Sequence, residues 1–289
     1  MTTGPGKVYK ITETVFEESS FRDKLYQPHN KQGETVYYAV CPRCDNPIQI
    51  IGLYRRSKLY GRHLPHSVPG LAEYRQEAYD FCPYAKPQLP DPKARKPYLD
   101  ERANQFLTLL KKQFDRVIYL LSRDTGVSIS FKLASQLLEQ YLRDKGYLYP
   151  WTTLGNLPWI FGHMAGPFSL FGRTIAKASP LRKAIETKYP RATFNDQNHL
   201  VAASKDVFLA LKFVFLRHRM RAKDESLEET LDFAVHDGPE APGAIIKPIY
   251  RETLKLDQAY FLNLVHASPE KTGPYRDQKL LELAKKLIG

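Results

Sequence analysis

The stretch VYYAVCPRCDNPIQIIGLY, Val36 to Tyr54, sets two cysteines in a tight turn between two runs of β-branched, aromatic and aliphatic residues. Runs of this composition, separated by turn residues, predict the two strands of a hairpin. Cys41 and Cys44 then lie at its tip with two residues between them. This spacing is typical of a metal-binding knuckle, because one turn can present both thiolates to the same ion.

Further ligands for a metal lie in the same part of the chain. Cys82 is the third and last cysteine, and two histidines stand between it and the knuckle. Three thiolates and one imidazole complete a tetrahedral zinc site that uses every cysteine in the protein. We therefore expect Zn²⁺ to be bound by Cys41, Cys44, His63 and Cys82, with His66 as the alternative fourth ligand.

Two other interpretations of the cysteines stay open. Free cysteines are often buried as small apolar side chains, and a C-x-x-C pair can be a redox dithiol. A redox pair usually opens a helix, whereas this pair follows a predicted strand and precedes Asn-Pro. A site closed by four protein ligands is structural; a position that exchanged with water would make the metal catalytic.

The charge of the chain favours anionic partners. Its 289 residues include 43 Lys and Arg against 31 Asp and Glu, a formal net charge of +12, which suits nucleic acid or an acidic protein surface. Cations and tyrosines interleave directly after the knuckle, where they could neutralise phosphates and stack on bases. The residues expected to bind nucleic acid are Arg55, Arg56, Lys58, Tyr60, Arg62, Lys93, Arg95, Lys96, Arg217, Arg219 and Arg221. The simpler alternative is a solvated basic loop.

The pattern predicts an α+β protein that is mostly α-helical. Residues 1–97 are expected to form a small zinc-ribbon-like β module that ends in a proline-rich linker, and residues 98–289 a larger α-helical domain. Within the first module, the alternation over residues 7–16 also predicts a strand.

Capping residues and apolar periodicity predict the helices of the second part. We expect helices from Asp100 to Gly126, from Ser130 to before Gly146, from Pro180, over Leu256–His266 and over Tyr275–Ile288. A buried helix is also expected within residues 200–223, and a capping box at Ser226 and Glu229 predicts another. Residues 120–142 resemble a helix-turn-helix, although an ordinary helical hairpin fits them better.

No nucleotide-binding or hydrolase motif is present in the sequence, so it favours binding over catalysis. The His236-Asp237 pair is the best remaining candidate for acid–base catalysis, but the Asp-Gly-Pro sequence around it is typical of a turn. We expect a zinc-binding, nucleic-acid-binding accessory or regulatory protein. The alternatives are a protein-interaction module of a larger assembly, docking a partner through the helical domain, and a toxin or defence effector acting on nucleic acid. Without a leader peptide or a run of roughly 20 apolar residues, we expect a cytoplasmic protein with no membrane partner.

Overall fold

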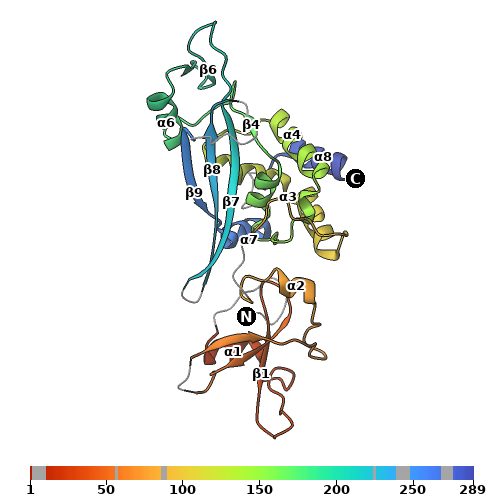
Figure 1. Ribbon diagram of the computed structural model, residues 1–289. Helices are drawn as coiled ribbons and strands as arrows, with labels where there is room; N and C mark the ends of the chain where they lie inside the picture. The colour runs from red at the N-terminus through yellow and green to blue at the C-terminus, as the bar shows by residue number, and fades with distance from the viewer. Residues whose placement is uncertain (2–10, 56–57, 86–89, 224–225, 239–247, 268–275) are drawn as a thin grey trace. The chain divides into compact units, whose positions relative to one another are not determined.

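The computed structural model describes Met1 and residues 11–55, 58–85, 90–223, 226–238, 248–267 and 276–289 (Figure 1). The chain divides into two compact units. The first unit comprises Met1–Leu89 with Met220–Glu228, and the second comprises Pro90–Arg219 with Glu229–Gly289. Within the described ranges, no helix is both long enough and apolar enough for a membrane crossing.

The first unit is built on a three-stranded antiparallel sheet in the order β1-β2-β3. Its strands are β1 (Tyr37–Val40), β2 (Pro47–Ile51) and β3 (Tyr60–His63), and its helices are α1 (Glu13–Ser20) and α2 (Gln76–Asp80). The predicted hairpin with the knuckle at its tip is confirmed, since β1 pairs with β2.

The strand predicted over residues 7–16 is wrong for the part of it that the structure describes. Thr12 caps helix α1 instead, its side chain accepting a hydrogen bond from the backbone N of Val15 at 3.2 Å. A threonine followed by an acidic first turn favours a helix start, and this local signal prevails over the alternation. Residues 7–10 lie outside the described part of the chain.

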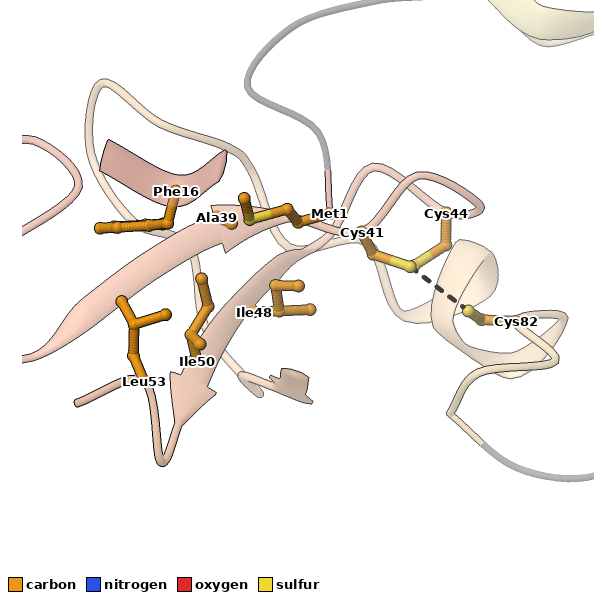
Figure 2. Packing of buried hydrophobic residues seen from close by; sticks show 9 residues of the cluster. All are labelled: Met1, Phe16, Ala39, Cys41, Cys44, Ile48, Ile50, Leu53 and Cys82. Carbon is orange, nitrogen blue, oxygen red and sulfur yellow. Dashed lines mark hydrogen bonds between the residues drawn. The ribbon is translucent and has the colours of Figure 1, made fainter. Parts of the chain in front are cut away.

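The core of the first unit lies on one face of the sheet (Figure 2). Alternate positions of β1 and β2 point into it, and Phe16 of α1 covers them. Burying each such side chain contributes about 1.5–3 kcal/mol, so this is a small core. Its buried members are Met1, Phe16, Ala39, Cys41, Cys44, Ile48, Ile50, Leu53 and Cys82.

Helices make up much of the second unit. They are α3 (Glu101–Thr125), α4 (Phe131–Arg143), the 3₁₀ turn η1 (Gly146–Leu148), α5 (Leu157–Met164), α6 (Pro180–Lys188), α7 (Gln258–His266) and α8 (Gln278–Ile288). The predicted ends of α3 are confirmed: Asp100 accepts a hydrogen bond from the backbone N of Ala103 at 2.8 Å, and Gly126 closes the helix at a φ of 70°. The predicted starts of α4 at Ser130 and α6 at Pro180 are confirmed too.

A four-stranded sheet in the order β4-β7-β8-β9 accompanies these helices. Its strands are β4 (Phe168–Ser169), β7 (Lys212–Lys223), β8 (Ser226–His236) and β9 (Tyr250–Lys255), and a separate hairpin joins β5 (Ala192–Phe194) to β6 (Leu200–Ala202). Helix α5 packs on β7 at Gly162, where a Cβ atom would lie 2.9 Å from the ring of Phe215.

The prediction of a mostly helical chain with strands confined to an N-terminal ribbon is wrong. The described residues form eight helices and about nine strands in three sheets, 36% helical and 22% strand. The buried helix expected within residues 200–223 is replaced by β6 and β7, and the capping box at Ser226 and Glu229 is part of β8. Residues Leu231–His236 are all buried, and a strand buried on both faces resembles a buried helix in sequence.

Candidate metal centre

Four potential metal ligands converge at one end of the first unit's sheet. The Sγ atoms of Cys41, Cys44 and Cys82 and a ring nitrogen of His63 all lie within 4.8 Å of one another. The three cysteines are buried, at 1%, 2% and 0% exposure, and Figure 2 shows their side chains gathered at the end of the strands, with the contact between Cys41 and Cys82 drawn as a dashed line. These residues could hold a metal ion.

The distances within this group match a tetrahedral zinc site. Zn–S bonds of about 2.3 Å and Zn–N bonds of about 2.0 Å separate two sulfurs by about 3.8 Å and a sulfur from a nitrogen by about 3.5 Å. The Sγ atoms of Cys41 and Cys82 lie 3.7 Å apart, and His63 Nε2 lies 3.3 Å from Cys44 Sγ and 3.6 Å from Cys82 Sγ. A disulfide would need about 2.05 Å between sulfurs, and all three cysteines are free thiols.

Each ligand is placed by a different local element. Cys41 directly follows β1, and the turn after it is closed by hydrogen bonds from the backbone N of Cys41 to Asn46 O at 2.9 Å and from the backbone N of Asp45 to Cys41 O at 3.0 Å. Asp45 adopts a φ of 55°, a left-handed conformation that aspartate tolerates in turns. This turn directs Cys44 back toward Cys41.

His63, the last residue of β3, is paired in register with Ile48 of β2. This pairing carries the imidazole to the knuckle end of the sheet. His66, the alternative ligand, lies three residues beyond the strand, is exposed, and is outside the group of four.

Asn46 joins the knuckle to the segment that carries Cys82. Its side-chain Oδ1 accepts a hydrogen bond from the backbone N of Arg75 at 2.6 Å, and its Nδ2 donates to Arg75 O at 3.0 Å. Arg75 is the residue before α2, and Cys82 follows that helix by two residues. Asn46 is fully buried. In the sequence, Asn46 precedes a proline and reads as a turn residue. Its hydrogen bonds to Arg75 were therefore not predicted.

The pKa values of the Cys44 and Cys82 thiols are shifted in opposite directions. Hydrogen bonds with Cys41 and Cys44, with help from the backbone N–H groups of Tyr84 and Ala85, lower the pKa of Cys82 to about 3. The same network, first through Cys41 and then through Cys82, raises the pKa of Cys44. One thiolate therefore forms readily in the cluster and opposes the formation of another. A bound dication would remove that opposition, because metal ligation deprotonates thiols.

The first unit carries the basic residues expected after the knuckle. Arg55 and Lys58 are exposed beside β3, and Tyr60 and Arg62 are exposed on it. Arg221, also exposed, belongs to the same unit. Arg56 lies outside the described residues.

Several of the remaining predicted cations interact with their own chain in the second unit. Arg95 donates to the backbone O atoms of Pro92, Ala94 and Asp144 at 2.8 to 2.9 Å. Lys96 pairs with Asp100 at 2.5 Å. Two more cations face Asp232, Arg219 at 3.1 Å and Arg217 at 3.9 Å. Of the set in this unit, Lys93 and Arg217 are exposed.

A second polar cluster, which the sequence did not indicate, is buried in the second unit around Glu229. Its Oε1 accepts hydrogen bonds from Asn156 Nδ2 and contacts His218 Nε2, both at 2.6 Å, and its Oε2 accepts from Gln258 Nε2 at 2.5 Å. Tyr149 contacts the other nitrogen of His218 at 3.0 Å. The side chains of His218 and Glu229 are 0% and 1% exposed, so the centre of this cluster is shielded from solvent.

The His236-Asp237 pair is not arranged as an acid–base pair that is open to solvent. His236 is buried at the end of β8, and Asp237 forms an ion pair with Arg191 at 3.6 Å. Asp237 also contributes to the raised pKa of Tyr189, about 12, although desolvation is the larger cause.

Comparison with known proteins gives no relative from which a role could be transferred: the chain matches no protein-family model, no curated protein and no solved structure.

Proposed function

We propose that this chain is a zinc-stabilised nucleic-acid-binding protein with an accessory or regulatory role. The observation that carries the proposal is the double use of strand β3. His63 faces the cysteine cluster, while its neighbour Arg62 is exposed. The strand that completes the metal centre therefore also presents cationic surface.

Zinc is the metal that suits these donors best. Three thiolates and an imidazole are soft or borderline ligands, which favour Zn²⁺ over the oxygen-preferring Mg²⁺ and Ca²⁺. With four protein ligands and buried cysteines, the site has the character of a structural centre. The metal would add folding free energy to a unit whose own apolar core is small.

Nucleic acid is the partner that suits the surface. The chain carries a formal charge of +12, and Arg55, Lys58 and Arg62 of the first unit are exposed close together in sequence around β3. Cations of this kind bind phosphates by releasing condensed counterions, so the resulting affinity depends steeply on salt.

The test is to purify the full chain and measure metal content and ultraviolet absorbance together, then to titrate labelled DNA and RNA at several salt concentrations. One equivalent of zinc and an affinity that falls linearly with the logarithm of salt concentration support the proposal. A chain that binds neither DNA nor RNA at low salt would refute it.

A further inference from the structure

The outer face of the β1-β2-β3 sheet differs from its buried face in chemistry. Strand alternation places Ala39, Ile48 and Ile50 in the core, at 0%, 4% and 2% exposure. Pro47 also has the opposite parity but is buried; the other positions of that parity face away from the core and are partly or fully exposed. These outer positions are Tyr38, Val40, Gln49, Ile51, Tyr60 and Arg62, a set without any carboxylate.

Strand register fixes how these side chains are arranged. Tyr38 pairs with Gln49, and Gln49 pairs with Arg62, so the three form one row across the sheet. At about 4.8 Å between strands, Tyr38 and Arg62 are separated by roughly 10 Å. Tyr60 lies two residues before Arg62, roughly 7 Å along β3. Arg62 therefore has one tyrosine on its own strand, Tyr60, and another on the far side of Gln49, Tyr38.

The arginine is available to an anion. Arg62 Nη2 donates to the neutral side chain of Gln49, with 2.6 Å between Nη2 and Oε1, and among the described residues no carboxylate pairs with it. Tyr60 is 44% exposed. A guanidinium held by an amide, with an exposed tyrosine two residues away and a half-buried tyrosine in the same row, combines a phosphate contact with stacking surfaces.

We infer that this face binds single-stranded nucleic acid, with bases stacked on Tyr60 and Tyr38 and a phosphate held by Arg62. Single strands are favoured because a tyrosine ring can stack only on a base whose face is exposed, and a duplex hides those faces. This inference rests on the proposed function and makes it specific. The metal centre contributes by fixing β3 through His63, the residue next to Arg62.

The test uses the full-length, zinc-loaded protein and fluorescence anisotropy with a labelled oligonucleotide of mixed sequence, as single-stranded DNA, single-stranded RNA and duplex DNA. We expect tighter binding of a single strand than of the duplex. Comparing the two single strands shows whether the ribose 2′-hydroxyl contributes.

Substitutions on the face give the decisive comparison. Tyr60→Ala should weaken single-strand binding about 5-fold or more, the effect of losing one stacked base. Tyr60→Phe, which keeps the ring, should stay within about twofold. Arg62→Gln should reduce the slope of log affinity against log salt concentration by about 1. Tyr98→Ala, which removes an exposed tyrosine of the second unit, should leave binding unchanged.

The possible results distinguish binding of single strands from nucleic-acid binding in general. Equal or tighter binding of the duplex, or an unchanged affinity in Tyr60→Ala with its zinc retained, overturns the single-strand inference while nucleic-acid binding stands. Failure of the wild-type protein to bind any of the three probes overturns both.

Discussion

The side-chain amide of Asn46 hydrogen-bonds both backbone polar groups of Arg75, its Oδ1 at 2.6 Å from the amide nitrogen and its Nδ2 at 3.0 Å from the carbonyl oxygen. The side-chain amide thereby makes the same pair of hydrogen bonds that the backbone of a neighbouring strand would make. It ties the turn that holds Cys41 and Cys44 to the start of the segment that delivers Cys82. We therefore expect metal binding by the four-residue group to depend on Asn46, although Asn46 offers no ligand.

Asn46→Ala should weaken metal binding about 10- to 100-fold, because side chains that support ligands typically contribute this much to affinity. The measurement is competition for zinc with a chromogenic chelator. Asn46→Asp keeps the acceptor for the backbone N of Arg75 and loses the donor, so its affinity should lie between those of Asn46→Ala and the wild type. An affinity for Asn46→Ala equal to that of the wild type would show that the ligands are positioned without it.

Cys82→Ser should abolish stoichiometric zinc binding and unfold the first unit, since a structural metal site contributes folding energy directly. Amide hydrogen exchange read by mass spectrometry should show protection lost around β1, β2 and β3 and kept in α3 and α4. His66→Ala is the matched control, because this exposed imidazole lies outside the ligand group. It should retain one equivalent of zinc. A wild-type melting curve that a strong chelator leaves unchanged would contradict the structural role.

His163 should make the second unit less stable in mild acid. Burial is the main cause that lowers the pKa of His163 to about 4. Its Nδ1 donates to Phe215 O at 2.8 Å, and its Nε2 is buried without a hydrogen-bond partner. The unfolded chain binds this proton near pH 6.5. Stabilisation is therefore complete above pH 6.5 and is lost as the pH falls toward 4, by up to about 3 kcal/mol.

Urea unfolding at pH 7.5 and pH 5 checks this prediction. Trp151 and Trp159 are the only tryptophans and both belong to the second unit, so tryptophan fluorescence reports on the unfolding of that unit. His163→Gln should reduce the difference in free energy of unfolding between the two pH values. An equal difference in the variant would assign the pH response to other groups.

Glu229→Ala should lower the free energy of unfolding of the second unit by about 3–5 kcal/mol, because it leaves the buried donor of Asn156 and the half-buried donor of Gln258 without their shared acceptor. Tryptophan fluorescence during urea unfolding measures the loss. Glu186→Ala removes a carboxylate from an exposed ion pair with Arg182 and should cost about 1 kcal/mol or less. Similar losses in the two variants would mean that the buried cluster is not a major source of stability.

Gly162→Ala should destabilise the contact between α5 and β7 by about 1–3 kcal/mol, the usual cost of overpacking a core. The added Cβ would meet Phe215 at 2.9 Å and Leu121 Cδ2 at 3.2 Å. In a double-mutant cycle with Phe215→Leu, the smaller leucine side chain should relieve the clash. Gly162→Ala should then cost less free energy of unfolding than it does in the presence of Phe215. Strictly additive changes in the free energy of unfolding would show that the added Cβ does not clash with Phe215.

Features that depend on neighbouring residues could be predicted from the amino-acid sequence. Helix α3 follows from the cap at Asp100, an apolar stripe and Gly126, because a helix start, face and end are all local signals. The knuckle followed from a spacing of two residues, and the prediction of a Cys₃His group followed from there being three cysteines in all. The choice between His63 and His66 could not be made in this way.

Features that depend on residues distant in sequence became visible only in the folded chain. The pairing of His63 with Ile48 brings that imidazole, and not His66, to the cysteines. Strands β7 and β8 were mistaken for helices because the second of them is buried on both faces and a φ of 52° at Arg217 interrupts the alternation of the first. Glu229 had the spacing of a helix cap but serves as the acceptor for side chains from three other segments. A residue's own neighbours set its backbone preference, whereas its burial and its partners are set by which elements pack together.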